Sequence, residues 1–361
     1  MDKLSIGFFT DSYFPEIDGV SYTLRHWKER LEERGHEVFI VYPGSKRYDP
    51  DEGEIPVRSL PNPLYRGYNI GLPLGYGKLP ELDVVHCHGP AFVGRYGRRY
   101  AAKEGIPKVY THHTPIEEYV EQAVRSKRIA NAVGRIYVPI ENRFLSKFDV
   151  VTASTGRMDR DVEAKKLTVG VDIDFFEPCE GSFVDEIDVE RPVVGYSGRV
   201  SREKNIGHLC RFAEGFDGSV VIVGEGPDRP RIQKMAGENV EVMDFLDRER
   251  LPEFYSGIDV FATASTGDTL GLSTLEANAC GTPVVAADVE PFSRTITSQN
   301  GERFEFGDTG DMLRAVETAL GNDYSTRGTA EQHCIRETID MLERIYEEET
   351  VGEVREMYQT A

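Results

Sequence analysis

Long apolar runs, paired cysteines and an excess of positive charge are all missing from this 361-residue chain. Because no run reaches about 18 apolar residues, we expect no segment that spans a membrane. The five cysteines are odd in number and scattered, without a Cys-x-x-Cys pair, which is typical of reduced thiols in a cytoplasmic protein. The formal net charge of −20 argues against a nucleic-acid partner, since binding nucleic acid requires a basic face.

Lysine is scarce as well, at 12 of the 42 basic residues. An acid-rich, lysine-poor surface resembles that of halophilic cytoplasmic proteins, and salt screens the self-repulsion of such a surface. We therefore expect the midpoint of unfolding to rise between low and molar salt.

The chain is longer than one ordinary core requires and predicts two domains. Residues 4–10 form an apolar run that indicates a first strand and not a signal peptide, and a loop, a helix over 21–34 and a strand over 37–42 follow. A similar pattern restarts at residue 192, which is typical of an α/β fold with doubly wound parallel sheets. We expect a first domain over 1–170, an acidic linker over 171–191, a second domain over 192–328 and a terminal helical part over 329–361.

Residues 265–288 carry the strongest chemical signal and predict a polar loop, a short helix and a buried strand. Asp268 in the loop and Glu276 on the helix would lie at the carboxyl end of a strand, where open α/β sheets bind ligands. An ionised carboxylate offers about four acceptor sites and no donor, which suits the hydroxyls of a sugar and a ribose. Structural alternatives stay open, because Ser273 and Glu276 fit a capping box and Asp268 fits an ordinary turn.

A diphosphate site is predicted in the loop that follows the strand beginning at residue 192. Gly195 and Gly198 leave room for a close backbone approach. Arg199 and Lys204 bring two cations to the start of the next helix, the first as a planar fork and the second as a point charge. Together they can neutralise a diphosphate.

The first domain offers weaker candidates. Its first loop lacks Gly-x-Gly-x-x-Gly, so no nicotinamide cofactor is expected, and Gly19 is either a glycine that approaches a phosphate or part of a plain turn. His86 and His88 alternate on a strand and could meet one ion, but no third ligand is evident and we expect no metal. Tyr65 and Tyr68 lie in a Gly-, Pro- and Tyr-rich stretch that is typical of a binding loop, which suggests contact with an acceptor.

The segment 268–285 resembles the E-x7-E motif of retaining glycosyltransferases of family four, which have the GT-B fold, and 198–204 resembles the Gly-Arg-x4-Lys clamp of that family. Asp268 stands where the family usually has Glu. The resemblance implies two Rossmann-like domains facing a cleft, with the acceptor on the first and a nucleotide-diphosphate sugar as donor substrate on the second. It also implies that the terminal helix within 329–361 crosses back to the first domain, and that no cofactor or metal is needed. It implies that Asp268 holds the donor sugar and Glu276 the ribose. It assigns catalytic roles to Arg199, Lys204 and Asp268. The other implied donor-binding residues are Gly19, Gly198, Thr269, Leu270 and Gly271.

Residues 109–115 resemble the His-Thr segment of the same family, whose histidine lies beside the reacting carbon of the donor. The resemblance assigns this role to His113, with His112 as the alternate, also a candidate for contact with the acceptor. The alternative interpretation is two loop histidines that hydrogen-bond the backbone.

The stretch 91–150 is basic, with 11 Lys and Arg against six acids, on an otherwise acidic chain. Apolar residues within it recur at helical spacing, namely Ile129, Val133, Ile136, Tyr137 and Ile140. This pattern predicts either a helix that docks on anionic lipid from the cytoplasmic side or a helix that faces the core.

The Asp-Thr-Leu-Gly sequence at 268–271 most resembles family members that glycosylate membrane lipids, such as sulfoquinovosyl-diacylglycerol synthases. The resemblance therefore implies a glycolipid or other glycan precursor as acceptor. Two rival readings are a GT-B sugar-nucleotide epimerase and a non-catalytic nucleotide-sugar-binding protein.

Overall fold

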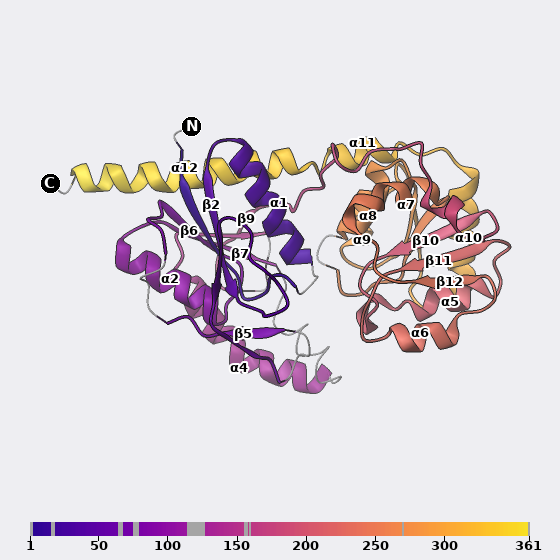
Figure 1. The fold of residues 1–361 in the computed structure, drawn as a ribbon, viewed down its shortest axis with the longest axis horizontal. Helices are drawn as coiled ribbons and strands as arrows, with labels where there is room; N and C mark the ends of the chain where they lie inside the picture. The colour runs from indigo at the N-terminus through magenta and orange to yellow at the C-terminus, as the bar shows by residue number, and fades with distance from the viewer. Residues whose placement is uncertain are drawn as a thin grey trace. The chain divides into compact units, whose positions relative to one another are not determined.

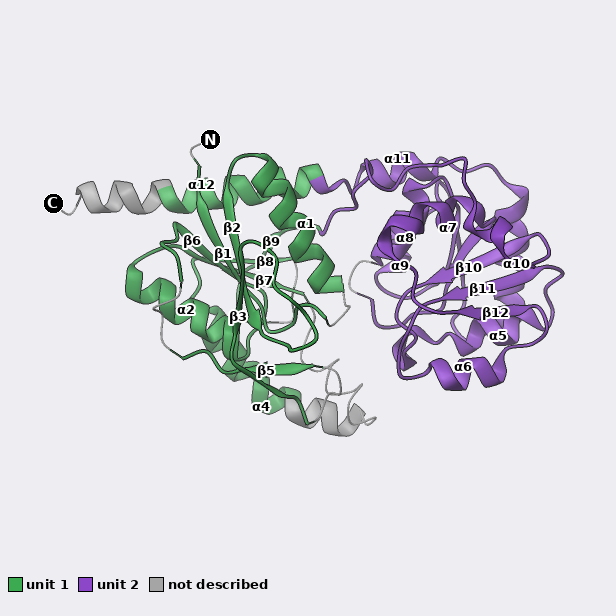
Figure 2. Cartoon of the chain, in the orientation of Figure 1, with its two compact units in different colours: residues 1–168, 336–361 green, residues 169–335 purple. Residues whose placement is uncertain are grey.

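The computed structural model describes residues 3–15, 19–63, 68–74, 79–113, 127–154, 158, 160–268 and 271–359. The chain divides into two compact units, which Figure 2 shows in two colours. Unit 1 comprises residues 1–168 and 336–361, and unit 2 comprises residues 169–335. Each unit is built on a parallel sheet with helices around it (Figure 1), which confirms the predicted α/β class.

The main sheet of unit 1 has the strand order β3-β2-β1-β6-β7-β8-β9, and every neighbouring pair is parallel. Its strands are β1 (Ser5–Phe9), β2 (Glu37–Pro43), β3 (Glu54–Val57), β6 (Val84–Cys87), β7 (Lys108–His112), β8 (Val150–Ala153) and β9 (Lys165–Lys166). A separate antiparallel pair consists of β4 (Ser59–Pro61) and β5 (Asn69–Gly71). The helices are α1 (Gly19–Glu33), α2 (Phe92–Glu104), α4 (Lys127–Leu145) and most of α12 (Ile335–Gln359).

Helices cover both faces of the unit 1 sheet. Neighbouring side chains of a strand point to opposite faces, so consecutive residues of β1 contact different helices. Phe8 of β1 meets Trp27 of α1 edge-on, with ring centroids 6.4 Å apart. The next residue, Phe9, packs against Tyr96 of α2 at 6.0 Å. The continuous apolar character of the first strand therefore follows from burial on two sides.

Unit 2 has a parallel sheet in the order β12-β11-β10-β13-β14-β15. Its strands are β10 (Val193–Ser197), β11 (Ser219–Val223), β12 (Val240–Met243), β13 (Val260–Thr263), β14 (Val284–Ala287) and β15 (Gly301–Phe304). The helices are α5 (Gly207–Ala213), α6 (Arg229–Met235), α7 (Leu251–Gly257), α8 (Leu272–Ala279), α9 (Phe292–Thr295), α10 (Thr309–Gly321) and α11 (Thr326–Glu331). Short 3-10 turns are η1 (Phe183–Glu186), η2 (Arg202–Lys204) and η3 (Arg248–Arg250).

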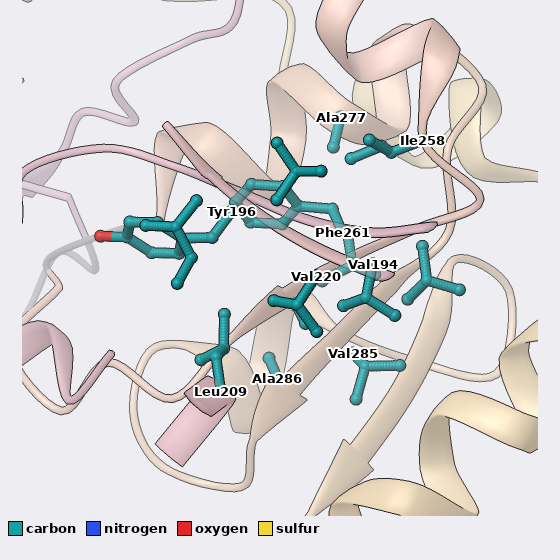
Figure 3. Packing of buried hydrophobic residues seen from close by; sticks show 14 of the residues in the cluster. Val194, Tyr196, Leu209, Val220, Ile258, Phe261, Ala277, Val285 and Ala286 are labelled. Carbon is teal, nitrogen blue, oxygen red and sulfur yellow. The ribbon is translucent and has the colours of Figure 1, made fainter. Parts of the chain in front are cut away.

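The core of unit 2 gathers on this sheet, and Figure 3 shows part of it. Tyr196 of β10 and Phe261 of β13 stack with their rings 6.2 Å apart. Val194 and Val220 lie on adjacent strands and are fully buried. This packing holds β10 and β13 in place, and the loops after these two strands carry the candidate donor residues.

The strand order reverses direction once in each sheet. In unit 2 the chain runs outward from β10 to β12 and then returns to place β13 on the other side of β10. In unit 1 the same reversal lies between β1 and β6. Because parallel strands end at one edge, the loops after β10 and β13 are neighbours, and ligands of open α/β sheets bind at such a reversal.

Residues 171–191, which we expected to form a linker, belong to unit 2. Phe176, Phe183 and Val184 from this segment are buried in the unit 2 core. The acids that suggested a linker alternate with apolar residues that face inward. The high acid content of the segment therefore did not reveal that it packs against the core.

The helix α12 lies along unit 1 (Figure 2). Its Asp340 accepts a hydrogen bond from Arg34, which directly follows α1, at 2.6 Å. The Tyr346 hydroxyl lies 2.7 Å from Nδ1 of His86 in the sheet. The buried apolar face of α12 consists of Ile335, Ile339, Leu342, Ile345 and Tyr346. Within the described ranges, no helix combines the length and the apolar character needed to cross a bilayer.

Candidate active site

Lys204 and Asp268 are brought into direct contact at the strand-order reversal of unit 2. The Lys204 Nζ atom lies 2.6 Å from Asp268 Oδ1, and each side chain is about one-fifth exposed. Asn205, in the left-handed region at φ 51°, donates from its amide to the Ala264 carbonyl at 3.1 Å and to Thr266 Oγ1 at 3.0 Å. These bonds tie η2 to the loop after β13 and so hold the lysine against the carboxylate.

Gly198 and Arg199 follow directly on β10. Gly198 has φ 148°, and a Cβ atom there would lie 3.1 Å from the Tyr196 hydroxyl oxygen. That hydroxyl donates to the Arg199 carbonyl at 3.1 Å. A Cβ atom on Gly224, in the loop after β11, would lie 1.9 Å from the Gly198 carbonyl oxygen. The glycines therefore let two strand-end loops pack closely beside Arg199.

Glu276 lies on α8 and accepts a hydrogen bond from the Tyr255 hydroxyl at 2.8 Å. Burial raises the pKa of Glu276, while the bond from Tyr255 and the positive charge of Arg248 act against the rise. The N-cap of α8 is Gly271, and no side chain caps the helix, so the capping box between Ser273 and Glu276 does not form. The carboxylate is therefore available for a role other than capping.

Gly271 is required by its surroundings. It has φ 75° in the left-handed region, and an added Cβ atom would lie 2.4 Å from the Phe292 ring. The two residues before it, Thr269 and Leu270, lie outside the described residues.

In unit 1, His113 follows β7 and its Nε2 atom lies 3.1 Å from Nδ1 of His88. His88 stacks on His86 with ring centroids 4.1 Å apart. Burial, together with the neighbouring His112, lowers the pKa of His113 to about 3. Burial also lowers the pKa of His88 well below its usual value. The pair is neutral at physiological pH, so one ring donates and the other accepts.

Both ring nitrogens of His86 are engaged by hydroxyl groups. Nδ1 lies 2.7 Å from the Tyr346 hydroxyl, and Nε2 lies 2.7 Å from Thr111 Oγ1. These two hydrogen bonds and the contact with the His88 ring account for the position of His86 on the sheet.

His112 is buried at the end of β7 and not in a loop. Its Nε2 atom lies 3.7 Å from Glu141 of α4, and Glu141 accepts a hydrogen bond from Arg160 Nε at 2.6 Å. Glu141 and Arg160 are both almost fully buried. This arrangement anchors α4 to the sheet.

Three other residues of unit 1 were predicted as site residues, and the structure describes two of them. Gly19 is the first residue of α1 and is exposed, and an added Cβ atom would meet no described atom within 4 Å. Tyr68 is half-buried before β5, and its carbonyl accepts from the backbone N–H of Asn62 at 2.8 Å. Tyr65 lies outside the described residues.

Sequence reasoning missed three residues that hold the candidate side chains in place. They are Tyr255, which bonds Glu276, His88, which bonds His113, and Asn205, which joins two loops. His88 follows β6, Tyr255 lies on α7 and Asn205 follows η2. No motif spacing connects any of them with its partner.

Two family models match the chain. The model for glycosyl transferases group 1 covers residues 180–338, and the model for glycosyltransferase family 4 covers residues 17–169. The alpha-monoglucosyldiacylglycerol synthase of Streptococcus pneumoniae is 30% identical over 355 residues, which cover 88% of this chain and 78% of the relative. The chain belongs to glycosyltransferase family four. It is therefore a glycosyltransferase, as predicted, and the epimerase and binding-protein readings are not favoured.

A further relative and a solved structure are also similar to this chain. The sulfoquinovosyl transferase SQD2 of Arabidopsis thaliana is 26% identical over 350 residues, covering 89% of this chain and 67% of that protein. A sucrose-phosphate synthase from Thermosynechococcus elongatus has a similar fold, with a TM-score of 0.73, 17% identity and coverage of 99% of this chain and 100% of that one. The GT-B fold predicted from the sequence is thus confirmed.

Proposed function

We propose that this family-four glycosyltransferase moves a sugar from a nucleotide-diphosphate sugar to a hydroxyl group of a membrane lipid. In the proposed reaction the anomeric configuration is retained and no metal takes part. The observation that carries the donor half of the proposal is the contact of Lys204 with Asp268 at the strand-order reversal. A cation for phosphate and an acceptor for sugar hydroxyls meet there, at the usual ligand position of an open sheet.

The chemistry assigned to unit 2 follows from charge. Breaking the bond between sugar and phosphate leaves negative charge on the departing diphosphate. Arg199 and Lys204 would stabilise that charge more in the transition state than in the ground state, and two fixed cations can serve in place of a metal. Gly198 leaves room for the diphosphate, Asp268 would accept from the donor sugar and Glu276 from the ribose.

For the other predicted donor residues we keep the roles that the family resemblance implies. Thr269, Leu270 and Gly271 would contribute to the donor site, and Gly19 would approach a phosphate. His113 would contact the donor near its reacting carbon as a neutral ring, because its lowered pKa keeps it from carrying charge near neutral pH.

The lipid acceptor is supported by the relatives, whose names refer to diacylglycerol and sulfoquinovosyl products. It is also supported by α4, where Ile136 and Ile140 are 72% and 47% exposed. Together with the exposed Arg143 they occupy positions i, i+4 and i+7, which share one helix face. An apolar and cationic face of this kind fits anionic headgroups, so we propose peripheral membrane contact through α4. Ile129 and Val133 were also predicted to lie on the apolar face of this helix, but their side chains are outside the described part of the structure.

The reaction is tested by incubating the protein with UDP-, GDP- and ADP-sugars and vesicles that contain diacylglycerol. Formation of a glycolipid in the presence of EDTA, with the donor's anomeric configuration seen by NMR, would support the proposal. Lys204→Ala should lower turnover by at least about tenfold, because it loses a charge-assisted contact. A product with inverted configuration would contradict retention, and dependence on a divalent ion would contradict a metal-free reaction. Turnover of Lys204→Ala equal to that of the wild type would contradict the role of Lys204.

Membrane contact is tested by flotation with vesicles of neutral or anionic lipid. Ile136→Ser with Ile140→Ser should reduce binding to anionic vesicles. A matched control is Phe306→Ser with Leu320→Ser in unit 2, which also removes two partly exposed apolar side chains. Equal flotation of the two double variants, or no binding by the wild type, would remove the proposed contact.

A further inference from the structure

Tyr255 is held rigidly beside the carboxylate assigned to the ribose. The side chain comes from α7, is 1% exposed, and packs between Phe176 at 6.0 Å and Phe261 at 5.7 Å. Its hydroxyl donates to Glu276 Oε2 at 2.8 Å. The direction of this bond is fixed, because an ionised carboxylate only accepts and burial keeps the tyrosine protonated by raising its pKa well above 10.

Tyr255 also lies near the end of β10. Ser197, the last residue of that strand, is close enough to lower the pKa of Tyr255, and Gly198 and Arg199 follow Ser197 directly. Tyr255 therefore lies between the end of the diphosphate strand and the carboxylate on α8. A tyrosine that only filled the core would not need its hydroxyl at this position.

The bond determines which acceptor sites of Glu276 remain open. Of about four lone-pair sites on a carboxylate, Tyr255 occupies one on Oε2 and thereby fixes the plane of the group. Oε1 and the remaining site on Oε2 can then accept from two neighbouring hydroxyls, as the 2′ and 3′ hydroxyls of a ribose provide. Without the tyrosine hydroxyl, the carboxylate can rotate and loses this orientation.

We propose that Tyr255 is a positioning residue that orients Glu276 toward both ribose hydroxyls and so sets the preference for ribonucleotides over 2′-deoxyribonucleotides. The inference rests on the proposed function, in which Glu276 contacts the ribose. A deoxyribose leaves one oriented acceptor without a donor. A hydrogen bond to a charged group that is lost in this way corresponds to about a tenfold to hundredfold weaker affinity.

The test compares nucleotide pairs by isothermal titration calorimetry, with UDP and dUDP, GDP and dGDP, and ADP and dADP. The wild-type protein should bind one ribonucleotide at least about tenfold more tightly than its deoxy counterpart. Tyr255→Phe keeps the ring packing and should weaken the ribonucleotide more than the deoxynucleotide, so that the affinity ratio falls toward one. Tyr324→Phe is a matched control, because Tyr324 also donates to a glutamate, Glu302, at 2.8 Å in unit 2. It should leave the ratio unchanged.

The outcomes separate the inference from the proposed function. If a folded Tyr255→Phe variant keeps the wild-type ratio of ribonucleotide to deoxynucleotide affinity, the positioning role is overturned. The proposed function, donor binding by unit 2, is unaffected by that result. Equal binding of ribo- and deoxynucleotides by the wild type would show that Glu276 does not recognise the ribose and would also overturn it. If the wild type binds none of the six nucleotides, the proposed function falls and the inference falls with it. Glu276→Gln is a second variant, and an unchanged ratio there would overturn the inference even if Tyr255→Phe does not fold.

Discussion

Replacing Asp268 with asparagine should have opposite effects on binding and on turnover. Lys204 is paired with Asp268 at 2.6 Å. The lysine must leave or share this partner when it turns to a diphosphate. Asparagine has nearly the same shape but no charge, so the variant offers Lys204 to the phosphate without competition.

The magnitude follows from the burial of the pair. Exposed ion pairs contribute about 0.2–1 kcal/mol, and breaking a buried pair costs about 3–5 kcal/mol. Side chains that are about one-fifth exposed lie between these cases, and we take about 1–2 kcal/mol. The affinity for the free nucleoside diphosphate should therefore rise about fivefold to thirtyfold in Asp268→Asn. Turnover of the nucleotide sugar should fall, because an ionised acceptor for the sugar hydroxyls is lost.

Calorimetry with the nucleoside diphosphate and a glycosyl-transfer assay measure the two effects on one preparation. Lys204→Met is the matched control, and it should weaken both binding and turnover. The affinity gain should shrink in molar salt, because screening already loosens the pair. Unchanged or weaker diphosphate binding by a folded Asp268→Asn protein would refute the competition between carboxylate and phosphate.

Two further predictions concern stability. Tyr346→Phe leaves Nδ1 of the buried His86 without its hydroxyl partner and should destabilise unit 1 by about 1–3 kcal/mol, measured by denaturant unfolding, whereas Tyr324→Phe on the partly exposed surface should cost less. Glu276→Gln should raise the Tm near neutral pH while weakening nucleotide binding. The raised pKa of Glu276 means that the folded state binds this proton more tightly than the unfolded chain, so stability falls as pH rises through the folded pKa. The gain in Tm should therefore shrink as pH falls, and a gain independent of pH would contradict this cause.

The sequence was sufficient for the fold and the family. The apolar runs at 4–10 and 37–42 and the helix between them became β1, β2 and α1 with nearly the expected bounds. These features depend on local periodicity and on residues a few positions apart, which a linear sequence displays directly. The same short spacing placed Arg199 and Lys204 after one strand, and the catalytic and binding roles assigned to them stay predictions.

The composition of a segment was a poor guide where charged and apolar side chains alternate along the chain. The acids of 171–191 suggested a linker, although Phe176, Phe183 and Val184 between them fill the core of unit 2. On α4, helical spacing left open whether the apolar residues face the core, and the structure exposes Ile136 and Ile140. The sum of a segment's charges does not reveal which of its side chains point inward.

The sequence by itself determined which side chains follow which strand, because motif spacing and strand length are local. Only the tertiary structure decided which of them touch. Lys204 meets Asp268 across 64 positions, Tyr255 meets Glu276 across 21, and His88 meets His113 across 25. The first and third contacts arise because strand order places the ends of distant strands at one edge of a sheet. The second joins α7 and α8, which pack beside the unit 2 sheet.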